Sequence, residues 1–334
     1  MLAGLLDIAR CPACAGVLRL DGEAAEWIET GALVCDADGS RYHIRRGMPY
    51  LYVDDQSWAP KAREADGWVR IHQDKQIYDQ TGVDIDFRLP YFEEEPWLKV
   101  ARQFDIALEL IRPSPGMQIL DVGAGRGWAA KQFAVRGCRV VAIDVADDDQ
   151  VGLGRSRALM EEAGVLFDAV VGDSERLPFA DGSFDVVFCA AALHHTTNLD
   201  RLMDNIARVL RPGGHLVAVN EPCIADGADD EEVRRTDLAE ELSYGINETR
   251  PRLDDYRRVF RHAGLHETAL FAWQSYGMSR AALTVWSRAL GVPAPRTFVR
   301  FARGAPQSWT DNLLRQRGGE LILAATKNRA GSAR

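Results

Sequence analysis

The sequence has no long hydrophobic run. None of its apolar stretches reaches the ~18 consecutive residues that a membrane-spanning helix needs. The opening residues, MLAGLLDIAR, have neither a charged start nor a long apolar segment, so we expect no secretory signal peptide. We therefore expect a cytoplasmic protein with no membrane partner.

Positive charge is also scarce. The 334 residues include 40 Lys and Arg against 49 Asp and Glu, which gives a net charge of −9. A large phosphate-coating surface is excluded, because nucleic-acid binders usually carry a basic face, and we expect no nucleic-acid partner. Arg41, Arg45 and Arg46 form one local basic cluster. Among the acids, 147–149 are expected to be solvated or to cap the helix that follows.

Cysteines are few and unevenly placed. Three of the six lie within the first 35 residues, and the other three are scattered through apolar stretches. Single cysteines in such stretches are usually small buried hydrophobic residues. We therefore expect no disulfide framework.

From residue 117 onward, short apolar runs alternate with helical patterns. Near-continuous apolar runs are typical of parallel strands that are buried on both faces. The alternation predicts a doubly wound α/β fold. The expected strands are 117–122, 138–144, 167–173, 184–191, 214–221, 265–272 and 319–327, and the expected helices are 96–112, 127–136, 151–163, 199–210 and 251–263.

Outside this alternation the pattern is less regular. The acidic stretch 226–232 is expected to be a solvated loop, and 276–316 a helical insertion that serves as a lid, a dimer contact or core. We predict three parts: a small β-rich domain at 1–53, a linker with helical pieces and a lid at 54–95, and the α/β domain at 96–330.

A glycine-rich turn, ILDVGAGRGW, follows the first strand of the α/β domain. Gly123, Gly125 and Gly127 open a helix there, and a helix N-terminus offers free N–H donors. A dinucleotide fingerprint would place its third glycine at 128, where the chain has Trp128. The glycines alone would also fit a plain strand–helix turn. Two acids at later strand ends favour an adenosine ligand, Asp144 for the ribose hydroxyls and Asp173 for the adenine amino group.

These motifs, with 172-GDSERLPF-179, 181-DGSFDVVFCAAALHH-195 and 208-RVLRPGGHLVAVNEP-222, resemble class I S-adenosylmethionine (SAM) dependent methyltransferases of the small-molecule and quinone-type branch. The resemblance implies a seven-stranded Rossmann-like sheet with an antiparallel last strand, and SAM as cofactor. It also implies that the cofactor is bound by Asp121, Gly123, Ala124, Gly125, Gly127, Asp144, Val145, Asp173, Ser174, Ala190 and Leu193.

Methyl transfer requires an aligned acceptor, exclusion of water and, for an acceptor with a proton to lose, a base. His194 and His195 follow the fourth strand, where the sulfonium would lie. Either could be the base, or both could be structural, one packing and one capping a helix. Glu221 ends the fifth strand and is expected to face the same cleft, with a surface acid or a helix cap as the alternative.

Substrate contacts are expected from Tyr78, Tyr244 and Asn247, although core packing is the alternative for Tyr78. The expected partners are a small-molecule substrate and a second copy in a homodimer.

The N-terminal cysteines have the spacing of a zinc ribbon. Cys11 and Cys14 form a CxxC knuckle and Cys35 follows, but the fourth position is Asp38. The flank resembles the zinc-ribbon domains of methyltransferase activator subunits and of ribosomal-RNA guanine methyltransferases. That likeness is carried by Tyr42, Ile44, Gly47, Pro49 and Leu51. The predicted zinc ligands are Cys11, Cys14, Cys35 and Asp38. The alternatives are His43 as the fourth ligand, or a ribbon without metal.

The predicted function is methyl transfer from SAM to a small-molecule acceptor in a metabolite-tailoring pathway, with the ribbon shaping the substrate side. Two alternatives stay open. One is an RNA base methyltransferase, and the other is a non-catalytic SAM-binding partner protein.

Overall fold

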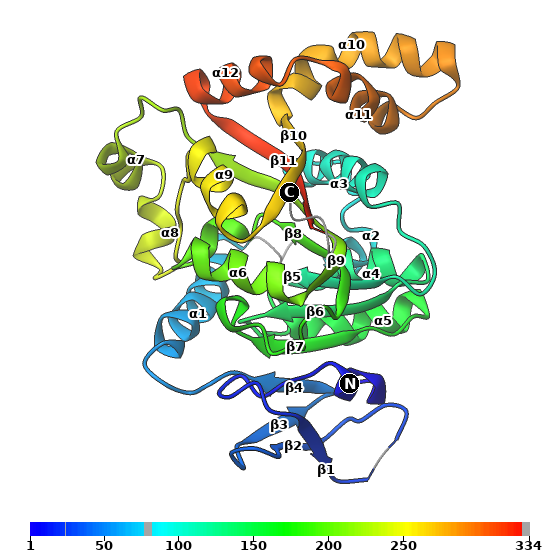
Figure 1. Cartoon of the computed structure of the whole chain (residues 1–334), viewed down its shortest axis with the longest axis vertical. Coiled ribbons are helices and arrows are strands. Elements are labelled where there is room, and N and C mark those ends of the chain that lie inside the picture. The colour runs from blue at the N-terminus through cyan, green and yellow to red at the C-terminus, as the bar shows by residue number, and fades with distance from the viewer. Residues whose placement is uncertain (24, 77–81, 329–334) are drawn as a thin grey trace.

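The computed structural model describes residues 1–23, 25–76 and 82–328, and the side chains of all of these except 82–84 and 277–282. Figure 1 shows a central sheet with helices on both faces, a small β-rich unit at one end and three helices at the other.

Seven strands form the α/β part of the sheet, in the order β7-β6-β5-β8-β9-β11-β10. β11 runs antiparallel to both of its neighbours, and β5 to β9 run parallel. This confirms the Rossmann-like α/β fold predicted from the sequence. The strands are β5 (Gln118–Val122), β6 (Arg139–Asp144), β7 (Asp168–Gly172), β8 (Phe184–Ala190), β9 (Leu210–Cys223), β10 (Leu265–Ala272) and β11 (Gly319–Lys327).

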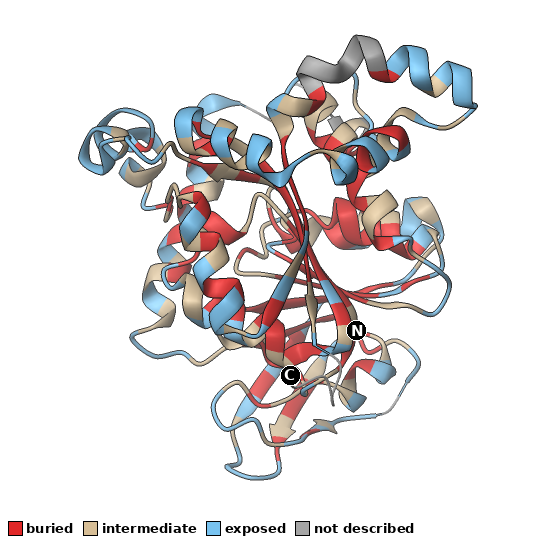
Figure 2. Cartoon of the chain, turned by 45° about the horizontal axis from the view of Figure 1, so that its top comes forward, coloured by how far each residue is buried: buried red, intermediate tan, exposed pale blue. Residues whose placement is uncertain are grey.

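Helices bury both faces of this sheet, as a doubly wound fold requires. On one face, α6 (Leu199–Val209) and α9 (Leu253–His262) pack through residues such as Met203 and Tyr256. On the other face lie α3 (Trp97–Ile111), α4 (Trp128–Val135) and α5 (Ser156–Ala163), with Phe104 and Phe133 in that core. Figure 2 shows the buried strands running between these two layers.

The N-terminal unit extends the same sheet. After the short helix η1 (Ala3–Asp7) it contains β1 (Leu18–Asp21), β2 (Gly31–Cys35), β3 (Arg41–Arg45) and β4 (Met48–Leu51), paired antiparallel in that order. β4 then pairs in parallel with β7, with Tyr50 opposite Val171. The apolar side chains of both units form one continuous core. The predicted division at residues 53 and 95 stays a prediction.

Acids of the α/β part also fasten the N-terminal unit. The Tyr50 hydroxyl donates to Asp147, and Arg46 pairs with Asp149. Asp148 accepts from the backbone N–H groups of residues 150 and 151. Asp149 is exposed, as expected of a solvated acid, although it pairs with Arg46. The expectation is wrong for Asp147, which is half-buried and bonds to Tyr50, a residue distant in the sequence.

The predicted linker with helical pieces does contain helices, and part of the acidic stretch expected to be a loop is helical as well. The predicted linker contains α1 (Trp58–Lys75), an 18-residue helix, and α2 (Gly82–Arg88). The acidic stretch expected to be a loop leads into α7 (Asp230–Thr236), followed by α8 (Ala239–Ser243). Asp229 caps α7 by accepting from the N–H groups of Glu231 and Glu232, so acids near a helix N-terminus stabilise it here.

The predicted insertion before the last strand forms α10 (Trp273–Leu290), α11 (Ala294–Gly304) and α12 (Gln307–Arg317). These helices lie at the top of Figure 1. Phe298 anchors them, because its ring packs edge-on against Phe271 of β10 and against Tyr276. Within the described ranges, no helix is both long enough and apolar enough to cross a bilayer.

Candidate functional site

A cleft of about 320 Å³ opens at the carboxyl ends of β5, β6, β7 and β8. The strand order reverses between β5 and β8, which is where doubly wound sheets bind their ligands. α1 contributes Lys61, Glu64, Trp68 and His72 to the wall of this cleft. The remaining wall comes from Trp97, Val122–Arg126, Trp128, Ile143–Ala146, Val151, Gly172, Ser174, Ala190–Ala192, His195 and Thr196.

The glycine turn forms one wall of the cleft. Gly123 has φ +67, and a β-carbon on it would lie 2.6 Å from the Ala192 side chain. The Gly125 N–H donates to Asp144 Oδ2 at 2.7 Å. Gly127 does not line the cleft; its left-handed backbone caps α4 where Phe167 packs closely. Gly123 and Gly125 thus keep backbone against the ligand space, and Gly127 serves packing.

The three predicted acids occupy different surroundings. Asp144 lines the cleft and accepts from the Ala146 and Gly125 N–H groups, while burial raises its pKa. Asp121 is buried beneath the turn, accepts from the Ala130 N–H, and has a pKa raised by burial to about 7. Asp173 is buried and caps the short helix η3 (Ser174–Arg176). Only Asp144 is placed to touch a ligand.

The predicted cofactor residues therefore divide into two groups. The cleft brings together Gly123, Ala124, Gly125, Asp144, Val145, Ser174 and Ala190. Behind its wall lie Asp121, Gly127, Asp173 and Leu193, all four of them outside the set of residues that line the cleft.

His195 faces the cleft from the loop after β8. Its Nδ1 lies 2.8 Å from the Asn247 carbonyl oxygen and 3.0 Å from Glu248. A carbonyl only accepts, so Nδ1 carries the proton and Nε2 keeps a lone pair. No residue of the described chain hydrogen-bonds Nε2. Burial and the neighbouring His194 lower the pKa of His195 well below 6.5, so its ring is a neutral base.

His194 and Glu221 lie behind that loop. Glu221 is fully buried and accepts from the Ala192 N–H at 2.8 Å and from His194 Nδ1 at 2.7 Å. It does not face the cleft, in contrast to the expectation from its place at a strand end. The reason is a bulge in β9 at Asn220, whose φ of +58 turns the following side chain inward. Both residues are placed to position the loop.

Three side chains of α1 that line the cleft, Lys61, Glu64 and Trp68, belong to no sequence motif and were not predicted. Lys61 and Glu175 form a buried ion pair at 2.8 Å. Although burial opposes it, Lys61 and Thr197 lower the pKa of Glu175 to about 2. Glu64 lies 3.8 Å from His195 Nδ1, and burial raises its pKa to about 8. The Trp68 ring meets the His195 ring edge-on at 5.3 Å.

The predicted substrate residues do not form a group. Asn247 donates to the carbonyls of His195 and Thr196, so it supports the histidine loop. Tyr244 donates to Asp74 near the end of α1 and does not line the cleft. Tyr78 lies outside the described residues. No described residue of the N-terminal unit lines the cleft, and the expectation that the ribbon shapes the substrate side stays a prediction.

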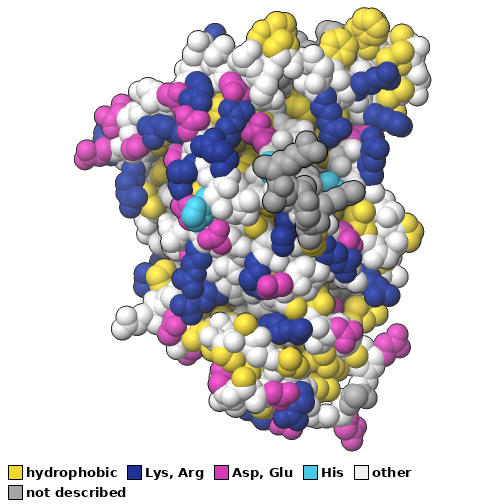
Figure 3. All heavy atoms as spheres, in the orientation of Figure 1, with side chains coloured by type: hydrophobic (Ala, Val, Ile, Leu, Met, Phe, Trp, Pro, Cys, Tyr) yellow, Lys and Arg dark blue, Asp and Glu magenta, His cyan; other side chains and the backbone are white. Residues whose placement is uncertain are grey.

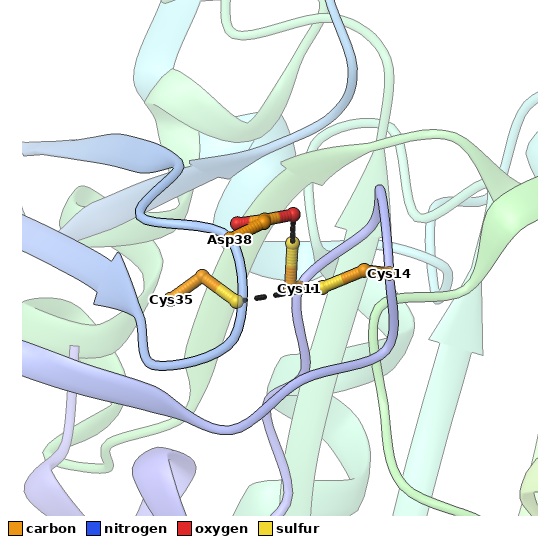
Figure 4. A group of neighbouring side chains, drawn as sticks. All are labelled: Cys11, Cys14, Cys35 and Asp38. Carbon is orange, nitrogen blue, oxygen red and sulfur yellow. Dashed lines mark hydrogen bonds between the residues drawn. The ribbon is translucent and has the colours of Figure 1, made fainter.

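The predicted zinc ligands do come together, as Figure 4 shows. The three sulfurs and one carboxylate oxygen all lie within 4.8 Å of one another, with Cys14 Sγ 3.5 Å from Cys35 Sγ and Cys11 Sγ 3.6 Å from Asp38 Oδ2. A β-carbon on Gly16 would lie 2.8 Å from Cys35 Sγ. His43 is exposed on β3 and is not in this group.

Asp38 is held in a suitable orientation for a ligand. The Ser40 N–H donates to its Oδ1, which lowers the pKa of the carboxyl and leaves Oδ2 facing Cys11. Three thiolates and one carboxylate oxygen are a chemically acceptable donor set for Zn²⁺. A second group of donors, His194, His195 and Glu248, is occupied internally because Arg250 pairs with Glu248.

Comparison with known proteins agrees with both parts of the fold. Residues 120–218 match the family described as a methyltransferase domain, and residues 4–47 match the family described as Trm112p-like protein. The resemblance to class I methyltransferases with a zinc-ribbon-like N-terminal domain is thereby confirmed.

Among curated relatives, the chain is 35% identical over 121 residues to a ubiquinone/menaquinone biosynthesis C-methyltransferase, UbiE, of Bordetella parapertussis, covering 36% of this chain and 46% of that protein. It is 35% identical over 150 residues to a sterol 24-C-methyltransferase of Gibberella zeae, covering 44% and 39%. The chain thus spans less than half the length of these relatives.

Among solved structures, the fold is similar to a Haemonchus contortus phosphoethanolamine N-methyltransferase 2 in complex with S-adenosyl-L-methionine. The TM-score is 0.52 with 18% identity, covering 78% of this chain and 60% of that one. At this identity the likeness concerns the fold alone.

Proposed function

Because the chain joins a Trm112p-like domain to a methyltransferase domain, we propose that it transfers a methyl group from SAM to a small-molecule acceptor. The cleft at the carboxyl ends of β5, β6 and β8 carries this proposal, since it sets the Gly123–Gly125 turn and Asp144 opposite a neutral His195. Six free cysteines fit a reducing compartment, and we place the reaction in the cytoplasm.

The cofactor lies along the glycine turn. Backbone at Gly123 and Gly125 admits the methionine portion closely, and Asp144 accepts from the ribose hydroxyls with its remaining lone pairs. Val145, Ser174 and Ala190 line the same cleft, where Val145 and Ser174 would contact the adenine and Ala190 the sulfur. Bound SAM supplies a methyl group that its sulfonium has already activated.

The acceptor occupies the side of the cleft between α1 and the His195 loop. Trp68 and Glu64 flank that side. His195 Nε2 accepts the proton that the acceptor loses as its nucleophilic atom bonds to the methyl carbon and the carbon–sulfur bond breaks. His194 and Glu221 hold the loop that presents His195, and α1 excludes water from it.

The acceptor is a small molecule rather than RNA. The basic cluster that favoured RNA is engaged within the protein: Arg41 pairs with Asp21, and Arg46 pairs with Asp149. Arg45 stacks over the Tyr50 ring. The named relatives are, by their names, a C-methyltransferase of ubiquinone/menaquinone biosynthesis and a sterol 24-C-methyltransferase, which favours a carbon acceptor in a biosynthetic pathway.

A structural Zn²⁺ at Cys11, Cys14, Cys35 and Asp38 belongs to the same proposal. The donors converge without rearrangement, and Gly16 leaves room that any larger residue would fill. The metal has no part in methyl transfer, because the site lies outside the cleft wall. Metal analysis of purified protein should find about one zinc per chain, and well under one after Cys11→Ser.

Labelled SAM tests the reaction. The full chain is incubated with SAM carrying an isotopically labelled methyl group and with separated small-molecule and RNA fractions of a cell extract. Label in the small-molecule fraction supports the proposal. Label in RNA would favour the RNA alternative, and tight SAM binding without transfer to any fraction would favour a non-catalytic partner protein.

A further inference from the structure

The helices between β10 and β11 expose large apolar side chains. Nine large apolar residues are exposed in the part of the chain that the structure describes, and five of them lie between 285 and 309. Single exposed apolar residues are common, but a cluster of this kind marks an interaction surface. Four members lie on α10 and α11: Val285 (66% exposed), Trp286 (49%), Leu290 (54%) and Phe301 (61%).

The same segment is purely basic. Residues 273–310 contain five arginines and no Lys, Asp or Glu, in a chain whose net charge is −9. The side chains of Arg288, Arg300 and Arg303 are exposed, and among the described residues none of them has an ion-pair partner. Arg296 lies 3.9 Å from Glu109. The positive charge is therefore available to an external partner.

Exposed apolar and basic side chains both occur along α10 and α11, on different sides of each helix. On α11, Arg296, Arg300 and Arg303 recur at i, i+4 and i+7, while Thr297 and Phe298 are buried on the opposite side. The Phe301 ring lies 6.2 Å from the ring of Trp286 on α10. We call Val285, Trp286, Leu290, Phe301, Arg288, Arg300 and Arg303 the cap surface.

The figures agree with this placement. In Figure 2 the end of α10 is coloured as exposed. In Figure 3 apolar and basic side chains dominate the top of the molecule on the right, above α3.

We propose that the cap surface binds the interface of an anionic phospholipid bilayer, with the aromatic rings in the headgroup region and the arginines on the phosphates. Aromatic and apolar groups flanked by arginine on an amphipathic helix are the pattern of in-plane interfacial binding. The binding is peripheral. It departs from the expectation of no membrane partner, which considered spanning segments only.

A second copy of the chain fits this surface less well. A two-fold contact would bring each arginine toward the same arginines of the other copy, with no acid of the segment to compensate. The bilayer supplies negative charge along its whole plane. The proposal stands apart from methyl transfer, because binding is measured without turnover.

Vesicle sedimentation tests the proposal. The full chain is mixed with vesicles of phosphatidylcholine alone or of phosphatidylcholine and phosphatidylglycerol in equal parts. We expect binding to the anionic vesicles only, weakened by added salt, and lowered about tenfold or more by Arg300→Glu with Arg303→Glu. Trp286→Ser with Phe301→Ser should lower binding by a similar factor.

Matched controls separate the cap surface from general charge and stickiness. Arg234→Glu with Arg235→Glu makes the same charge change on α7, and Leu166→Ser removes an equally exposed apolar residue elsewhere. Both controls should bind as the unchanged protein does. The proposal is overturned if the unchanged protein does not sediment with anionic vesicles, if controls and cap variants lose binding equally, or if sedimentation velocity shows a dimer that Trp286→Ser disrupts.

Discussion

Gly123 and Ala192 are in such close approach that a β-carbon on the glycine would lie 2.6 Å from the alanine side chain. The contact joins the turn after β5 to the loop after β8, the two walls of the cleft. A side chain at 123 must push these walls apart. The cleft geometry therefore depends on this glycine more than on the other two of the motif.

Gly123→Ala should weaken S-adenosylhomocysteine binding about tenfold or more, as measured by titration calorimetry, because a small displacement of a ligand-holding turn is costly. Gly116→Ala is the matched control: its φ is +83, but nothing lies within 4 Å of the added carbon. That variant should lose about 1–2 kcal/mol of unfolding free energy and keep its affinity. Equal affinity losses in both variants would contradict the role of the Ala192 contact.

Glu64 should make SAM binding depend on pH. Its pKa of about 8 means that the carboxyl is neutral at pH 7 and ionises as the pH rises through 8. An anion there attracts the sulfonium, so the affinity for SAM should increase from pH 7 to pH 9, while that for S-adenosylhomocysteine, which has no sulfonium charge, should change less. Glu64→Gln should remove the difference between the two ligands. A difference that persists in this variant would exclude Glu64.

His195 and His194 should respond differently to removal. His195→Ala should lower the methylation rate about 100-fold or more, the usual contribution of a general base, with S-adenosylhomocysteine affinity nearly unchanged. His194→Ala should instead lower the unfolding free energy by about 1–3 kcal/mol, because it leaves Oε2 of the buried Glu221 without its side-chain donor. Chemical denaturation and single-turnover rates of the two variants distinguish these roles, and the reverse pattern would be incompatible with the assignment.

The low pKa of His195 also has a pH signature. Because the folded chain holds this imidazole neutral, the unfolded chain binds the extra proton as the pH falls below 6.5, and folding stability should decline in that range. The methylation rate should stay constant to well below pH 6.5 before it falls. Thermal unfolding and rate profiles across this range check both points.

Asp38→Ala should release zinc and lower the melting temperature, by about 2–4 °C for each kcal/mol lost. Asp36→Ala, two residues away and outside the donor group, is the control and should keep both. A chelator should destabilise the unchanged protein but not Cys11→Ser. Equal zinc content in the two Asp variants would show that Asp38 is not a ligand.

Strands, helices and the glycine turn could be predicted because each depends on a local pattern. Apolar runs identified β5 to β9, and turn spacing placed Gly123 and Asp144. The α1 residues could not be predicted in the same way. Glu64 and Trp68 reach the cleft because α1, which lies in the predicted linker, packs across it. No sequence motif indicates this packing.

The direction in which a side chain points could not be predicted from the sequence either. Glu221 lies two residues before the end of β9, and a one-residue bulge at Asn220 turns its side chain away from the cleft. Likewise, the sequence around Asp147 and Asp149 gives no sign of their partners. Tyr50 and Arg46 are about a hundred residues away in the sequence. Such pairings are set by the tertiary fold.

The pairing of β4 with β7 bears on self-association. β7 is buried along its whole length, and without β4 its outer edge would present unpaired N–H and C=O groups beside apolar side chains. An edge of that kind is a template for strand addition by other molecules, and hence for aggregation. The N-terminal unit therefore protects the α/β sheet from strand addition at the edge of β7.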